Sequence, residues 1–241
     1  MRLSALLFRQ IHKWIGLVIG LQFVIWTISG ALMAVLDMET VAGGPRAAAA
    51  KPAPLPLTTA AWPAVQQSLG PNPVTAVSVR PLLARHVIEV GTPDGILLFD
   101  ARTGMRIIVD AALARQVAQA SYPGRGAVKD VELLRERTLA IREHSLPAWR
   151  VDFADAQNSS FYVSQESGKL LERRNDTWRI WDFVWMLHNM DYLNRTSFNH
   201  PLIVIVGFAA AWLALTGLYL LFKTTWRPEL RLLKHMKRSQ L

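Results

Sequence analysis

Two long apolar runs dominate the pattern of hydrophobic and polar positions, one near each end of the chain. The first extends from Trp14 to Leu36 and the second from Pro201 to Phe222. A helix needs about 20 predominantly apolar residues to cross the hydrocarbon core of a bilayer, and both runs have this length. The pattern therefore predicts transmembrane helices over 14–36 and 201–222, with residues 1–13 as a short amphipathic lead-in to the first.

The composition changes directly after the first run. Residues 37–56 are rich in alanine, glycine and proline, which indicates an extended linker. A helix is expected over 58–69, because a threonine can cap its start and Gly70-Pro71 ends it. Short stretches that alternate apolar and polar residues follow, separated by turn sequences. The strands expected in this part are 74–79, 86–90, 96–100 and 105–109.

The same order of elements recurs further along. A helix is expected over Ala111–Ser121, and strands over 128–134, 149–153, 160–164 and 169–173. When LLFDARTGMRI is set beside FYVSQESGKLL, Gly104 and Gly168 fall in register, each in a turn between two extended runs. We therefore expect two repeats, 57–110 and 111–174, each with a helix and a small antiparallel sheet. The expected fold class is membrane α+β, in which two transmembrane helices flank this extracytoplasmic α+β domain.

Residues 175–200 are expected to contain an amphipathic helix outside the second span. Three tryptophans and His188 recur at helical spacing on one face, whereas Arg179, Asp182 and Asn189 lie off that face. Such a helix either lies in the membrane interface or packs its tryptophan face on the outer domain. The tryptophans are Trp178, Trp181 and Trp185.

The net charge of +9 is unevenly distributed. Residues 1–13 and 223–241 hold nine Lys/Arg and one acidic residue, whereas 37–200 holds 18 Lys/Arg and 17 Asp/Glu. Basic residues that flank apolar spans and avoid the loop between them follow the positive-inside rule. We therefore expect both termini, including the basic tail 223–241, in the cytoplasm and 37–200 in the periplasm of a protein of the inner membrane. The pattern argues against nucleic acid as a partner and for the lipid bilayer.

The absence of cysteine and of several catalytic motifs from the sequence excludes further kinds of site. The chain has no cysteine, which excludes disulfides, thiolate metal sites, iron–sulfur ligation and covalent haem attachment. The first apolar run is longer than the core of about 7–15 residues in a signal peptide, so we interpret it as an uncleaved anchor. The outer segment contains no nucleophile elbow or His-Glu-x-x-His run, and we predict no catalytic residue there.

The order of several short motifs resembles the PepSY-associated transmembrane family. The motifs are HKWIGLVIGL (12–21), SGALM (29–33), PDGILLFDARTG (93–104), WRIWDFVWMLHNMDY (178–192) and LTGLYLLF (215–222). The combination is distinctive, although no single motif is. The resemblance implies that the two expected repeats are PepSY-like.

The resemblance also carries an implied function. Larger members of the family are associated with iron and siderophore uptake, and some resemble haem-containing inner-membrane reductases of ferric siderophores. They use histidines near the helix ends, and the matching positions are His12 and His188. The resemblance thus implies a haem b-binding redox protein or ferric-siderophore reductase partner. Since this chain has fewer spans than those members, it is expected either to dimerise or to have lost the redox role.

Three histidines border the spans and are the candidate cofactor-binding residues: His12, His188 and His200. Haem b is held by axial ligands and packing, so a bis-histidine site needs two imidazoles that face each other across the ring. His12 lies at the inner edge and the other two at the outer edge, about 30 Å away. The possible pairs are His188 with His200, or any of the three with its counterpart in a second copy. The alternatives are an interfacial anchor for His12 and a helix-start residue for His200.

Helix association is also indicated by small residues four apart, at Gly16 and Gly20 and at Gly207 and Ala211. We expect a homodimer or a larger membrane complex. The remaining histidines, His86, His144 and His235, are expected to be ordinary surface or lipid-facing residues.

Of the possible functions, only the redox role would make the chain part of an enzyme. Two other functions remain open. One is a membrane-tethered module that binds a peptide, a peptidase or a transporter. The other is a structural subunit of a larger complex. The candidate ligands are a siderophore and a peptide.

Overall fold

A computed structural model describes residues 2–45 and 61–223 of the chain. The chain divides into two compact units, one formed by residues 1–35 and 182–241 and the other by residues 36–181. Much of the linker and of the basic tail lies outside the described residues.

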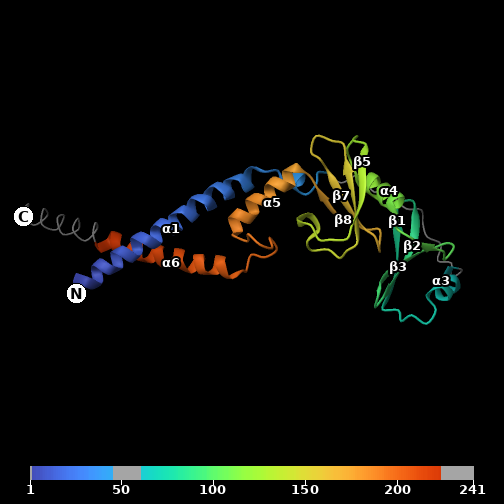
Figure 1. The fold of residues 1–241 in the computed structure, drawn as a ribbon, viewed down its shortest axis with the longest axis horizontal. Helices are drawn as coiled ribbons and strands as arrows, with labels where there is room; N and C mark the ends of the chain where they lie inside the picture. The colour runs from blue at the N-terminus through green and yellow to red at the C-terminus, as the bar shows by residue number, and fades with distance from the viewer. Residues whose placement is uncertain (1, 46–60, 224–241) are drawn as a thin grey trace, which may run out of the picture. The chain divides into compact units, whose positions relative to one another are not determined.

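The first unit is helical. Helix α1 (Arg2–Val35) and helix α6 (Pro201–Leu221) lie side by side (Figure 1). Both contain a segment long and apolar enough to cross a membrane, Arg9–Val35 in α1 and Pro201–Leu221 in α6. The expected lead-in 1–13 is continuous with the first span, because residues 2–13 contain no proline or glycine to break the helix.

One stripe of α1 makes the contact with α6. Its members follow alternating steps of three and four residues, the spacing that keeps side chains on one helical face. Ile19 of this stripe is buried together with Val206 of α6 and Met190. The members of the stripe are His12, Ile15, Ile19, Gln22, Trp26 and Ser29.

Helix α5 (Asp176–Asn189) precedes α6 and is shorter than the expected helical region. It ends at Asn189, and residues 190–200 form the connection to α6. On the tryptophan face, Trp178 and Trp185 are buried and Trp181 is half-buried. The expectation that Asp182 and Asn189 lie off the buried face is wrong, because both are buried. Each makes a hydrogen bond there: the Asp182 Oδ2 accepts from Arg195 at 2.9 Å, and the Asn189 amide donates to the Trp185 carbonyl at 3.1 Å.

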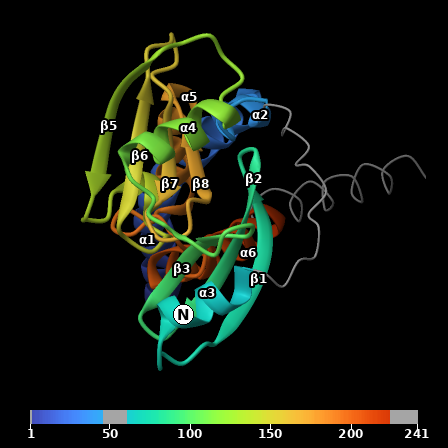
Figure 2. The ribbon, with the colours of Figure 1, turned by 90° about the vertical axis from the view of Figure 1, so that its right-hand side faces the viewer.

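The second unit contains two four-stranded antiparallel sheets (Figure 2). In each, the strands follow one another in chain order. The first sheet has helix α3 (Trp62–Leu69) on one face, and helix α4 (Ala111–Ser121) packs on the second sheet. The short helices α2 (Met38–Val41) and η2 (Leu139–Ile141) complete the unit. The strands are β1 (Ala76–Leu82), β2 (Arg85–Thr92), β3 (Gly95–Asp100), β4 (Arg106–Ile107), β5 (Val128–Leu134), β6 (Ala148–Phe153), β7 (Ser160–Ser164) and β8 (Leu170–Arg174).

The two turns aligned in the sequence have the same backbone conformation. Gly104 and Gly168 have φ angles of +73° and +64°, a region that glycine adopts without steric cost. The N–H of Gly104 donates to the Asp100 carbonyl at 2.8 Å, and that of Gly168 donates to the Ser164 carbonyl at 2.9 Å. The repeated turn is therefore confirmed in its hydrogen bonding.

The two repeats share one apolar core. Val87 and Leu98 of the first sheet are buried in the same cluster as Val151 and Phe161 of the second, together with Ala118 of α4. The first sheet buries apolar side chains on both of its faces. Its opposite face buries another set, formed by Ile88, Val90 and Phe99 with Val65 and Leu69 of α3. Adjacent residues such as Val87 and Ile88 are both buried because successive side chains point to opposite faces.

Candidate functional site

Two histidines of the helical unit have closely matched surroundings. The His12 Nδ1 lies 2.8 Å from the Thr216 hydroxyl of α6, and its ring lies 6.2 Å from that of Trp212. The His188 Nδ1 of α5 lies 3.0 Å from the Ser29 hydroxyl of α1. Each imidazole thus contacts a hydroxyl group on a different helix, near one end of α1.

The hydroxyl partners determine which ring nitrogen carries the proton. The Ser29 hydroxyl donates its single proton to the Ile25 carbonyl at 2.6 Å, and the Thr216 hydroxyl donates to the Trp212 carbonyl at 2.8 Å. With the hydroxyl proton used in this way, each oxygen accepts from the imidazole, and Nδ1 is the protonated nitrogen. In a neutral ring this leaves Nε2 with its lone pair, the form in which histidine ligates a metal.

A glycine follows each hydroxyl residue and lies against the same imidazole. A Cβ atom at Gly30 would come within 3.2 Å of the His188 Cε1, and one at Gly217 would come within 3.8 Å of the His12 Cε1. The dipeptides Ser29-Gly30 and Thr216-Gly217 thus each provide an acceptor and the space for a ring.

The stripe of α1 that carries His12 and Ser29 contains one unsatisfied polar atom. The amide nitrogen of Gln22 is buried, and no hydrogen-bond partner for it is present among the described residues. Trp26, on the same stripe, donates from its indole nitrogen to the His188 carbonyl at 2.7 Å and so holds the end of α5 on α1.

The two imidazoles do not converge on one position. His12 and Ser29, the partner of His188, are separated by 17 residues of one helix, or about 25 Å at a rise of about 1.5 Å per residue. Among residues 2–45 and 61–223, no group of three or more histidine, cysteine or acidic side chains is positioned to hold a metal ion. Each imidazole can therefore supply one axial ligand, and a second must come from elsewhere.

His200 differs from the other two. It is the residue before α6, and its Nε2 lies 2.6 Å from the backbone carbonyl of Asn189. A carbonyl can only accept, so Nε2 carries the proton and is used in closing the 190–200 connection. This arrangement corresponds to the helix-start interpretation. Of the other histidines, His144 bonds the Glu172 carboxylate at 2.8 Å, and His235 lies outside the described residues.

The connection between α5 and α6 is organised around one carboxylate. Asp191 accepts from the backbone N–H groups of Asn194, Thr196 and Ser197 at 2.8–3.2 Å. Burial acts to raise the pKa of Asp191, but the backbone N–H groups of residues 194–197 outweigh it and lower the pKa to about 2. The carboxylate thus fixes the segment between His188 and the start of the second span.

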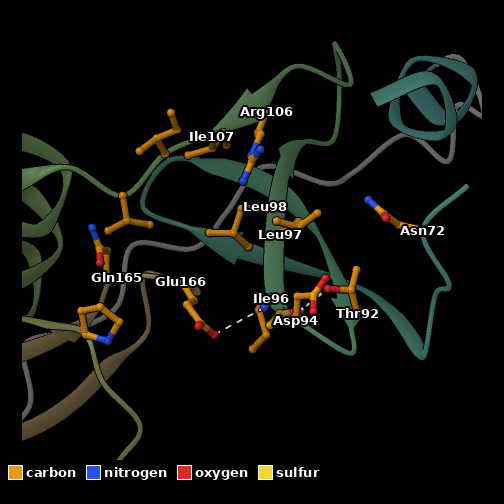
Figure 3. A pocket seen from close by; sticks show the side chains of 14 residues that line it. Asn72, Thr92, Asp94, Ile96, Leu97, Leu98, Arg106, Ile107, Gln165 and Glu166 are labelled. Atoms are coloured by element: carbon orange, nitrogen blue, oxygen red, sulfur yellow. Dashed lines mark hydrogen bonds between the residues drawn. The ribbon is translucent and has the colours of Figure 1, made fainter. Parts of the chain in front are cut away.

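A second candidate site lies in the unit formed by the repeats. A cavity of about 480 Å³ opens beside β3, and Figure 3 shows Glu166 pointing across it toward Ile96. Apolar side chains of both repeats line it together with three charged residues. The charged residues are Asp94, Arg106 and Glu166.

Sequence reasoning found the histidines but not their partners. Ser29 and Thr216 were visible only as uncharged polar residues in apolar spans, and Gln22 likewise. One signal was available: both hydroxyl residues are followed by glycine, and His12, Gln22 and Ser29 share one helical face.

A family described as the PepSY-associated TM region matches residues 9–241. No curated protein and no solved structure matches the chain. The match covers both spans and both repeats, as the sequence motifs indicated. The chain belongs to the PepSY-associated transmembrane family, and it is a membrane protein.

Proposed function

We propose that this protein is a haem b-binding electron-transfer protein of the inner membrane in which His12 and His188 are axial ligands. The observation that carries the proposal is the matched pair of imidazoles, each with Nδ1 bonded to a hydroxyl that has no other proton to give. Ligating histidines are commonly held by a hydrogen bond from their second ring nitrogen. His200, whose Nε2 is engaged by a backbone carbonyl, is not proposed as a ligand.

The histidines of one chain provide one of the two axial ligands that each haem site needs, so each chain carries two half-sites. Each chain supplies one imidazole near each end of α1, and bis-histidine ligation needs two. We therefore propose a homodimer in which the two copies of His12 form an inner pair and the two copies of His188 an outer pair. Small residues on the spans favour close helix approach, and Gly20 and Gly207 have open space beside them for another helix.

The chain's own residues orient and isolate these ligands. Ser29 and Thr216 fix the rotation of each ring through Nδ1. Trp26 anchors the end of α5, and Trp212 lies beside His12. The surrounding apolar side chains limit access of water, which influences the reduction potential. Haem b, when bound, supplies one-electron redox chemistry.

The family resemblance gives the proposed process, reduction of ferric siderophores in iron acquisition. Under the proposed topology, with both termini in the cytoplasm and 37–200 in the periplasm, the inner pair accepts electrons on the cytoplasmic side. The outer pair lies on the side where a ferric siderophore arrives. The charge distribution of the flanks supports this orientation.

The test is the visible spectrum of the full chain, purified from haem-replete cells. We expect a Soret band that shifts on reduction and that is retained in His200→Ala. A protein that is colourless and stays so after addition of hemin would refute the redox proposal.

A second function is favoured by the cavity beside β3. It is a membrane-tethered module that binds a partner through the outer repeats without redox chemistry, as an accessory subunit of a peptidase or transporter system. This function needs only the unit formed by residues 36–181 and is compatible with the loss of haem.

A further inference from the structure

The last strand of the first repeat is cut short compared with its counterpart. In the second repeat, β8 pairs with β7 at four positions, from Val163 to Ser160. In the first repeat, β4 pairs with β3 at two positions, Leu98 and Phe99. The register of Gly104 with Gly168 makes Ile96 the counterpart of Ser160. Among residues 2–45 and 61–223, Ile96 therefore lacks the neighbouring strand that Ser160 has.

Residues 108–110 explain why β4 ends early. The Val109 carbonyl accepts from the Trp149 indole at 2.9 Å rather than from a strand. Asp110 caps α4 by accepting from the Leu113 N–H at 2.8 Å. The chain thus turns into the helix where a longer β4 would have continued along β3.

The position left by the missing residues is the cavity of about 480 Å³ beside β3. The Ile96 N–H points into it and reaches the Glu166 carboxylate at 3.4 Å (Figure 3), which is long compared with the usual limit of about 3.2 Å. Ile108, on the rim, is 73 % exposed. A sheet edge whose donor makes only a long hydrogen bond to a side chain, and whose rim is apolar, is suited to receiving an added strand.

The charges indicate what kind of strand fits. Asp94 and Glu166 flank the Gly95 end of β3, and the carboxylate of Glu166 is close enough to crowd a Cβ atom at Gly95. In the second repeat the strand in this position ends in two arginines, and Arg174 lies opposite Ser160. A segment that lies beyond the end of β4 in this same register brings a basic side chain opposite Ile96 and beside Glu166.

We propose that this groove binds an extended peptide segment of a partner protein by strand addition to β3. The segment carries apolar side chains for the rim and an arginine or lysine that meets Glu166. The inference does not depend on haem, because all of its residues lie in the unit formed by residues 36–181. A colourless protein would leave it intact, and failure of peptide binding would leave the haem proposal intact.

The test uses the full chain in detergent and a fluorescent peptide, Lys-Leu-Leu-Glu-Arg-Arg, which is the sequence of residues 169–174. Only alternate N–H groups of an added strand face the edge of the sheet. We therefore expect N-methylation of one alternate set to abolish binding and of the other set to leave it unchanged. Binding should also slow hydrogen exchange at the Ile96 amide.

The variant Glu166→Gln should weaken binding about threefold to tenfold by removing the charge. The matched control is Glu143→Gln, an exposed acid outside the groove, which should have no effect. The proposal is overturned by no binding up to about 1 mM peptide, by equal effects of the two methylated sets, or by an unprotected Ile96 amide.

Discussion

His188 and Ser29 are 159 positions apart in the sequence, and a hydrogen bond of 3.0 Å joins the imidazole Nδ1 of one to the hydroxyl of the other. His12 and Thr216 repeat this relationship at 2.8 Å near the opposite end of α1. The short contacts of both hydroxyls to backbone carbonyls favour the tautomer of each ring that leaves Nε2 available. Two helices of one small unit thus hold an imidazole in the same way.

Removing the Ser29 hydroxyl is expected to loosen the ring of His188. The variant Ser29→Ala leaves the Nδ1 proton without its acceptor, and loss of such a supporting bond typically lowers metal affinity about 10-fold to 100-fold. Haem retention after dilution measures the effect. Thr27→Ala is the matched control, because the Thr27 hydroxyl also donates to its own helix, at 2.8 Å to Phe23, but is exposed. Equal haem loss in both variants would contradict the assigned role of Ser29.

Adding a methyl group beside the His188 ring is also expected to lower the affinity for haem. In Gly30→Ala the new Cβ lies 3.2 Å from the His188 Cε1, so the ring must shift. Overpacking of this kind costs about 1–3 kcal/mol, which corresponds to a roughly fivefold to hundredfold loss of affinity at the outer pair. In Gly217→Ala the nearest atom, the His12 Cε1, lies 3.8 Å from the new group, which is an ordinary contact distance, and little change is expected. Titration with hemin compares the two, and an unchanged Gly30→Ala would show that the ring is not confined there.

Much of the fold could be predicted because its signals are local. The strands Val128–Leu134 and Ser160–Ser164 and the helix Ala111–Ser121 begin and end at the predicted residues. Their alternating or helical patterns and their turn residues lie within a few positions of each other.

What could not be predicted depends on distant contacts. The strand expected over 105–109 covers only Arg106–Ile107, because Trp149, 40 positions away, takes the Val109 carbonyl. The burial of Asp182 depends on its ion pair with Arg195, which the helical pattern does not encode. The candidate site could be predicted only in part for the same reason. His12 and His188 follow from the family motifs, but their hydroxyl partners lie on other helices.

The connection before the second span is expected to respond to acid through Asp191. Its pKa of about 2 in the folded protein lies below the ordinary aspartate value of 3.8. The stabilisation is therefore fully present above about pH 4 and is lost as the pH falls through about 2. Below about pH 3, the amides of Asn194 and Thr196 should exchange faster relative to their intrinsic rates.

At neutral pH, Asp191→Asn should speed exchange of the same amides by about tenfold. Asp130→Asn, which alters an exposed strand residue, serves as the control and should leave them unchanged. Equal protection in wild type and Asp191→Asn would mean that the carboxylate does not hold this segment.

The proposed topology is tested by reporter fusions at residues 48 and 241. The excess of basic residues at the flanks predicts that a periplasmic reporter is active at residue 48 and a cytoplasmic one at residue 241. A cytoplasmic reporter that is active at residue 48 would contradict the orientation and place the His188 pair on the inner side.

The most direct test of the haem proposal is the amount of haem per chain in the purified, hemin-saturated protein. Two half-sites per chain that pair across a dimer predict about one haem per chain. His12→Ala and His188→Ala should each retain about half of it, and the double variant none. His144→Ala, which removes a histidine paired with Glu172 in the other unit, should bind as much as wild type. A double variant that binds as much haem as wild type, or a wild type that binds none, would contradict the assignment.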